Sequence, residues 1–489
     1  MLYDLINCPH RVTMDLHADP NDRDETSAFV KLLWEKGALF EKEVIQGTHE
    51  TFTDLSLFRG DEKLAQTTQA MLRGDALIYS GRIAHDNLLG EPDLMRRQGS
   101  GYIAGDIKSG AGLEDVAESD NPGKPKKHYA MQLALYTDIL EKQGHSPERK
   151  AFIWDINGEE VTYDFTLPMG PRTPKTLWML YQECRTEAAA ILQDSKKTLP
   201  AYGGVCKMCH WYSACMSQME KSDDLTLIPE LGRVKRDELL SAIPTTHAMA
   251  SIEPQEYAEG KSTIFKGIGQ PSLDKFHRRA KLITAGDDAK PYLTSPIYLP
   301  EEPRELFFDI EVDPMRDLCY LHGFIERNAA GDNKTEKFVY FFAEEVSDEA
   351  EKHAFAQALQ YINDSSPCAI YYYSKYERTI YRKLQKKYPD VCTEQDIETL
   401  FDPTQAVDLY FDIVLKATEW PTRDYSIKSL AKYLGFQWRD TNPSGAASIE
   451  WFDRWIQTQD PEIQQRILDY NEDDCVATRV LKDGLAQLR

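Results

Sequence analysis

Residues 206–215 carry three of the chain's nine cysteines, in the spacing C-x2-C-x5-C. The obvious fourth thiol is Cys8, which precedes Pro9 near the other end of the same expected domain. Four thiolates suit a tetrahedral zinc ion or an iron–sulfur cluster, because soft sulfur ligands favour both. The sequence therefore predicts a metal centre that ties the start of one domain to its end, with the ligands Cys8, Cys206, Cys209 and Cys215.

The composition is that of a folded chain with more than one domain. At 489 residues, with 42% hydrophobic and 28% charged residues, the chain is too long for one ordinary core, so two or three domains are expected. It has no apolar run of about 18 residues and no basic-then-apolar leader, so we expect neither a membrane span nor secretion. Five cysteines lie singly outside the cluster, which favours a reducing compartment, the cytoplasm, over a disulfide framework.

The net charge of -23 argues against a protein that coats nucleic acid along its whole surface. It does not exclude a nuclease, because metal-binding carboxylates add negative charge and only the substrate track needs basic side chains. Local basic runs lie at residues 96–97, 124–128 and 275–281. Solvated surface is the plainer interpretation of each run.

One expected strand of the first domain places a carboxylate beside an ammonium group. Residues 102–108 alternate so that Asp106 and Lys108 share one face, while Ile103 and Ile107 share the other. A D-x-K pair alone is common surface charge. Neighbouring elements give this pair its context, with Glu41 on a helix over 29–44, Asp93 delivered by short strands over 76–81 and 88–94, and Gln132 and Tyr136 four residues apart on a helix over 128–142.

In this order the residues resemble the RecB-like branch of the PD-(D/E)xK nucleases, including CRISPR-associated members that carry a four-cysteine iron–sulfur cluster. The resemblance covers residues 1–222 and implies a 4Fe–4S cluster rather than zinc at the four cysteines. It also implies roles for the polar residues: Mg²⁺ or Mn²⁺ held by Glu41, Asp93, Asp106 and the carbonyl of Ile107, developing charge stabilised by Lys108, and the scissile strand held by Gln132 and Tyr136.

Two residues depart from the pattern of this branch. The strand carries Asp106 where Glu is commoner, and the helix offers Glu41 where several iron–sulfur relatives carry His. His49 is a nearby alternative to Glu41.

Residues 223–300 look like helix-hairpin-helix units. A turn at Gly232 separates two expected helices, and residues 266–269, Lys-Gly-Ile-Gly, precede a helix rich in Lys and Arg. Such units bind a phosphate backbone through loop N–H groups and helix N-termini without reading sequence. A plain helical linker is the alternative.

In residues 301–489, an expected strand over 306–312 places Asp309 and Glu311 on one face. Two carboxylates on one strand face are costly unless a cation lies between them. The pattern then predicts strands over 319–325, 337–342 and 369–373, helices over 348–362 and 376–387, and a final helix begun by Asp460 and Pro461.

This order resembles the ribonuclease H-like exonucleases called DEDD. Their D-x-E motif matches Asp309 and Glu311, and their Y-x3-D motif matches Tyr470 and Asp474. Their second motif, N-x2-F/Y-D, is altered to Tyr-Ser-Lys-Tyr-Glu over 373–377, so Glu377 is the third ligand by position and Asp408 is the fallback. The resemblance implies two metals held by Asp309, Glu311, Glu377 and Asp474, with Tyr470 orienting the attacking water.

The expected architecture is α/β and multidomain: a PD-(D/E)xK nuclease domain with a 4Fe–4S cluster over 1–222, a helix-hairpin-helix-like DNA-binding segment over 223–300, and a ribonuclease H-like 3'-5' exonuclease domain over 301–489. The expected function is a Mg²⁺- or Mn²⁺-dependent deoxyribonuclease acting on single strands or ends, in DNA repair or defence. A nucleic-acid-binding scaffold with an inactive second domain and an RNA exonuclease are the alternatives. No G-x4-G-K-S/T motif is present, so a helicase would be a separate partner.

Overall fold

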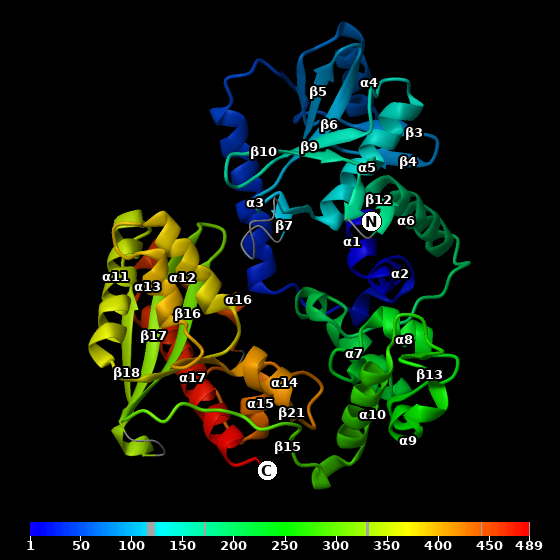
Figure 1. The fold of residues 1–489 in the computed structure, drawn as a ribbon. Helices are drawn as coiled ribbons and strands as arrows, with labels where there is room; N and C mark the ends of the chain where they lie inside the picture. The colour runs from blue at the N-terminus through cyan, green and yellow to red at the C-terminus, as the bar shows by residue number, and fades with distance from the viewer. Residues whose placement is uncertain (115–122, 171–172, 329–331, 442, 489) are drawn as a thin grey trace. The chain divides into compact units, whose positions relative to one another are not determined.

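The computed structural model describes residues 1–114, 123–170, 173–328, 332–441 and 443–488. The chain divides into two compact units (Figure 1). Unit 1 consists of Met1–Pro200 and Gly204–Ala214, and unit 2 of Ala201–Gly203 and Cys215–Arg489. The division therefore falls inside the cysteine segment, and residues 223–300 belong to unit 2. Among the described residues, no helix has both the length and the apolar character needed to cross a membrane.

Unit 1 is built on a mixed sheet of six strands, in the order β1-β2-β5-β6-β9-β10. Strand β6 lies at its centre, antiparallel to β5 and parallel to β9. The strands are β1 (Thr53–Asp54), β2 (Leu77–Tyr79), β5 (Leu94–Gln98), β6 (Gly101–Ile107), β9 (Lys150–Trp154) and β10 (Glu160–Asp164). Helix α5 (Lys127–Lys142) packs on this sheet, because its run of Ala, Leu, Met and Ile buries most of its circumference.

The expected strand over 88–94 is wrong as a single element. Strand β4 (Leu88–Gly90) pairs with β3 (Ile83–His85) in a separate hairpin, and β5 begins only at Leu94. Pro92 lies between them and cannot donate to a strand ladder. Asp93 consequently lies at the entrance to β5.

Further helices of unit 1 surround this framework. Cys8 ends α1 with an extended backbone and precedes Pro9, whose fixed φ suits the first position of α2. The helices are α1 (Leu2–Asn7), α2 (Pro9–His17), α3 (Ala28–Gly47), α4 (Gly60–Arg73) and α6 (Leu177–Leu192).

Unit 2 contains a five-stranded sheet in the order β18-β17-β16-β19-β20. Strands β16 (Arg304–Asp313), β17 (Leu318–Asn328) and β18 (Lys337–Phe342) form an antiparallel meander, and β19 (Ala369–Tyr372) and β20 (Ala406–Asp408) continue it in parallel with β16. These strands and the helices α11 (Asp348–Ser365) and α12 (Tyr376–Lys387) confirm the elements expected in this part of the sequence.

Both faces of β16 are covered. Phe308 and Ile310 pack into a core with α11 and α12, whereas Phe307 packs into a second core with α17 (Pro461–Ala486). Alternation along the strand therefore turns Asp309 and Glu311 toward α17. Helix α17 begins as expected, with the Asp460 side chain accepting from the Glu462 N–H and Pro461 in the first turn.

Residues 223–300 form a small helical region with its own core, which includes Leu225, Leu273 and Phe276. Its helices are α8 (Arg233–Leu239), α9 (Thr246–Ser251) and α10 (Gln270–Thr284). The helix expected before Gly232 is wrong, since only the 3-10 turn Leu225–Leu227 forms there. Strand β15 (Tyr292–Leu293) pairs with β21 (Thr418–Glu419), which joins this region to the rest of unit 2.

Candidate functional site

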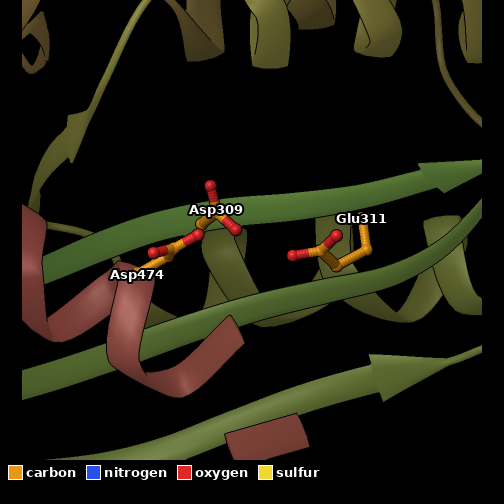
Figure 2. Close-up of side chains that lie close together, drawn as sticks. All are labelled: Asp309, Glu311 and Asp474. Atoms are coloured by element: carbon orange, nitrogen blue, oxygen red, sulfur yellow. The ribbon is translucent and has the colours of Figure 1, made fainter. Parts of the chain in front are cut away.

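Three carboxylates meet in unit 2 between the central strand and the last helix. Asp309 and Glu311 project from β16 and Asp474 from α17 (Figure 2), and each offers an oxygen within 4.8 Å of the other two. Among the residues that the structure describes, this is the one group of three or more potential metal ligands whose atoms lie so close together. Glu311 and Asp474 are buried. Strand alternation predicts that Asp309 and Glu311 share one face, and the resemblance to the DEDD exonucleases implies Asp474 as their partner.

Burial and mutual repulsion raise the pKa values of these carboxyls. Burial, then the charges of Asp474 and Glu311, raise the pKa of Asp309 well above its usual value. Burial and the charge of Asp474 raise the pKa of Glu311 to about 8. The pKa of Asp474 is raised by burial, against the opposing charge of Lys428. A cation in their midst would let all three ionise at neutral pH.

Lys428 is a member of the site that no sequence motif indicated. It lies on the short helix α15 (Ile427–Tyr433), and its Nζ donates to the Tyr470 Oη at 2.8 Å. Its charge lowers the pKa of each of the three converging carboxyls. Tyr470 is itself buried, and burial and Asp474 raise the pKa of its hydroxyl. An ammonium group therefore lies against the hydroxyl expected to orient water.

Two further residues fix the carboxylates in position. The Asn471 Nδ2 donates to the Asp309 Oδ2 at 2.7 Å, and the Trp438 Nε1 donates to the Asp474 Oδ1 at 2.6 Å. Gly323 faces Asp309 across the β16–β17 ladder, and a Cβ there would lie 2.8 Å from the Asn471 Cγ. The absence of a side chain at Gly323 makes room for the amide that holds Asp309.

The two candidates for the next ligand, Glu377 and Asp408, differ in their hydrogen bonds. Glu377 lies in the first turn of α12, buried, and adds to the charge that raises the pKa of Asp309. Its Oε2 is buried and has no hydrogen-bond partner among the described residues. The Asp408 Oδ1, in contrast, accepts three backbone N–H bonds, from Ser374, Tyr410 and Phe411. Asp408 caps a helical turn, and Glu377 has the available oxygen.

This donor set fits a hard divalent cation. All its ligand atoms are carboxylate oxygens, which Mg²⁺ and Mn²⁺ prefer. The orphaned Glu377 oxygen and the raised carboxyl pKa values are both features that such a cation would relieve.

Residues 306–486 match the family model of the RNase_H superfamily. The matched span contains the converging carboxylates, Glu377 and Tyr470. The match identifies this part of unit 2 as a ribonuclease H-like domain with a nuclease-type fold. No curated protein and no solved structure matches the chain.

A second polar constellation lies in unit 1. The Lys108 Nζ is 2.9 Å from the Asp106 Oδ2, as strand alternation predicted. The Asp93 Oδ2 accepts from the Ile107 N–H at 2.9 Å. Burial and the charge of Asp106 raise the pKa of Asp93 well above its usual value, and Glu41 adds to the shift. Burial lowers the pKa of Lys108, but Asp106 and Asp93 more than offset it, so the ammonium form is favoured.

The amide and hydroxyl expected on α5 reach the same place. The Lys108 Nζ lies 3.5 Å from the Gln132 Oε1, and the Gln132 Nε2 donates to the Tyr136 Oη at 2.7 Å. The Glu41 Oε1 accepts from the Tyr79 hydroxyl at 2.9 Å. His49 is exposed and follows the end of α3, whereas Glu41 lies on α3 itself. The metal-ligand roles of these residues, and of the Ile107 carbonyl, stay predictions.

The four clustered cysteines are half-buried, and all nine cysteines of the chain lie in its described part without a disulfide. Cys8 lies between α1 and α2, and its charge acts on the Cys209 thiol, whose pKa is raised chiefly by burial. Cys215 lies on α7 (Tyr212–Ser222), where unit 2 begins.

The residues beside the cysteines fasten their segment to α2. His210 Nε2 and Trp211 Nε1 contact the Asp15 Oδ1 at 2.7 and 2.8 Å. The Trp211 ring is fully buried. The segment that carries Cys206 and Cys209 is thereby held to the helix that follows Cys8.

Proposed function

We propose that the chain is a divalent-metal-dependent nuclease that hydrolyses phosphodiester bonds of DNA, at single strands or ends, through two catalytic centres. The observation that carries the proposal is the convergence of Asp309, Glu311 and Asp474 inside the span that matches the RNase_H superfamily. Phosphodiester hydrolysis is the chemistry that such a carboxylate group serves.

In the unit 2 centre, Asp309, Glu311, Glu377 and Asp474 would hold Mg²⁺ or Mn²⁺. When bound, the ions would polarise the phosphoryl oxygens and lower the pKa of bound water. Lys428 donates to the Tyr470 oxygen, so the hydrogen of Tyr470 points elsewhere and is available to the attacking water or to Asp474. Tyr470 and Lys428 thus orient the nucleophile, and Asn471 keeps Asp309 turned toward the site.

In the unit 1 centre, Glu41, Asp93 and Asp106 would hold a divalent cation with the carbonyl of Ile107. Lys108 stabilises the negative charge that develops on the phosphoryl group, and Gln132 and Tyr136 hold the scissile strand. The contacts that join Lys108 to Asp106 and to Gln132 support this assignment.

Cys8, Cys206, Cys209 and Cys215 would hold a 4Fe–4S cluster with a structural role. The support is the spacing C-x2-C-x5-C together with Cys8 at the other end of the domain. Freshly purified anaerobic protein that contains zinc but no iron or sulfide would contradict the cluster.

Residues 223–300 are assigned a helix-hairpin-helix-like role in holding the DNA backbone, with RNA as the alternative polymer and a separate helicase as a candidate partner. The Lys-Gly-Ile-Gly sequence before α10 supports contact with phosphate groups, whereas Lys275, Arg278 and Arg279 of α10 already pair with Glu230 or Glu419.

The decisive experiment is digestion of end-labelled single- and double-stranded DNA and RNA with Mg²⁺ or Mn²⁺. Wild-type protein is expected to cut DNA, and 3'- and 5'-labelled substrates report the polarity. Asp309→Asn and Lys108→Ala, made separately, are expected each to remove one class of product, with Asp412→Asn, an exposed aspartate, as the matched control. Failure of the wild type to cut any substrate would sink the proposal.

A further inference from the structure

Three aromatic rings gather beside the ammonium group of the unit 1 site. Tyr3, on α1, lies 4.8 Å between ring centroids from His128, and His128 lies 4.5 Å from Tyr129, both in edge-to-face geometry. Tyr3 and Tyr129 are 6.2 Å apart with their planes inclined by only 34°. His128 and Tyr129 open helix α5, the helix that also carries Gln132. The rings therefore lie next to the site of Lys108 and Gln132 in unit 1.

Two ammonium groups lie near the Tyr129 ring. The Lys108 Nζ lies 5.7 Å and the Lys126 Nζ 5.3 Å from the centroid of the Tyr129 ring. The charge of Lys108 also acts on the Tyr3 hydroxyl. Burial, with the charges of Lys126 and Lys108, lowers the pKa of His128 to about 4, so this ring is uncharged at neutral pH.

Packing of α1 on α5 does not account for the whole arrangement. Leu2 and Leu5 supply the buried face of α1, whereas 38% of the Tyr3 surface stays exposed. His128 and Tyr129 are only half-buried. Partly exposed rings beside two ammonium groups match what a single nucleic-acid strand offers, a base face next to its phosphates.

We propose that Tyr3, His128 and Tyr129 form a stacking platform for an unpaired base adjoining the phosphate that Lys108 engages, with Lys126 contacting a neighbouring phosphate. The platform rests on the proposed nuclease function of unit 1 and defines its substrate as single-stranded. A base in a duplex is stacked on both faces and does not offer one to a platform unless it leaves the stack. Unit 1 therefore prefers single strands and frayed ends.

The test uses full-length protein and single-stranded DNA with one 5-iododeoxyuridine, without divalent ions so that no cleavage occurs. Irradiation is expected to crosslink the DNA to the peptide that contains Tyr3 or to the one that contains Tyr129. Replacing Tyr3 with Leu keeps an apolar side chain but removes the ring, and is expected to weaken crosslinking and single-strand binding by about fivefold or more. Tyr3→Phe is expected to keep both, as is the control Tyr298→Leu, at an exposed tyrosine of unit 2.

Wild-type affinity and crosslinking in Tyr3→Leu and in His128→Ala would overturn the platform. The melting temperatures of both variants show whether a loss of binding comes from the missing ring or from unfolding. Equal losses in Tyr3→Phe and Tyr3→Leu would also overturn it, because they would indicate a role for the hydroxyl and not for the ring. Crosslinks at these peptides without any cleavage once Mg²⁺ is added would support the platform and contradict the nuclease function.

Discussion

Replacing Gly323 with alanine places a methyl group where the amide of Asn471 now lies. The added Cβ would stand 2.8 Å from the Asn471 Cγ, closer still to its Oδ1, and 3.1 Å from the Phe338 Cε2. The Asn471 side chain must therefore move, and its hydrogen bond to the Asp309 Oδ2 is lost. The substitution acts on a metal-ligand candidate that it does not itself touch.

The size of the effect follows from two terms. A hydrogen bond to a charged group contributes about 1.5–3 kcal/mol, and overpacking a buried position costs about 1–3 kcal/mol. If the hydrogen bond to Asp309 is lost only in the transition state, the rate falls by roughly 10- to 150-fold. Asn471→Ala loses the hydrogen bond and also removes the clash. Adding Gly323→Ala to Asn471→Ala is therefore expected to change the rate little. The effects of the two single substitutions on the activation free energy then exceed that of the double variant by at least about 1 kcal/mol.

The assay is exonuclease digestion of end-labelled DNA in a Lys108→Ala background, which leaves only the unit 2 centre. Gly445→Ala is the matched control, because a Cβ there meets nothing within 4 Å. Melting temperatures with and without Mg²⁺ separate misfolding from loss of the site. Wild-type rates in Gly323→Ala, or strictly additive losses in the double variant, would refute the reasoning.

The remaining predictions concern charge. Lys428→Met is expected to lower the kcat of unit 2 at least about tenfold and Lys428→Arg less, because the ammonium group contacts Tyr470; equal rates in both variants and the wild type would contradict this role. A carboxyl whose pKa is higher folded than unfolded stabilises the fold at low pH and loses that effect as pH rises through the folded value. With the pKa of Glu311 at about 8, metal-free protein is expected to lose thermal stability from about pH 5 to about pH 8, Mg²⁺ to restore it most near pH 8, and Glu311→Gln to flatten the profile. Arg279→Met is expected to cost about 3–5 kcal/mol in denaturant unfolding, because it leaves the buried Glu419 carboxylate, 2.7 Å from the Arg279 Nε, without that partner. Arg278→Met, at a 43% exposed arginine, is expected to cost less than about 1 kcal/mol, and equal losses would show that burial does not matter there.

Sequence patterns located most of the elements that carry the unit 2 site because local rules decide them. Alternation along β16 turned Asp309 and Glu311 to one face, and the Asp460-Pro461 pair marked the start of α17. The choice between Glu377 and Asp408 was beyond these rules. It depends on which carboxylate the backbone of other segments already satisfies.

The residues that sequence reasoning missed owe their positions to tertiary packing. Lys428 and Trp438 lie far along the chain from any motif and reach the carboxylates only through the placement of α15 and the segment after it. Asn471 adjoins Tyr470, yet its role depends on the strand register that sets Gly323 opposite Asp309. A glycine in a strand was the only sequence signal, and it marks close approach without naming the partner.

The two constellations place their ammonium groups differently. In unit 1, Lys108 lies 2.9 Å from Asp106, so one carboxylate of the site already has a cation partner before any metal binds. In unit 2, Lys428 donates to the Tyr470 hydroxyl, and its charge only moderates the repulsion among the carboxylates. Their pKa values consequently stay high, as the pKa of Asp93 does in unit 1. A divalent cation bound by either set of carboxylates would therefore displace protons, and we expect its affinity to rise with pH in both units.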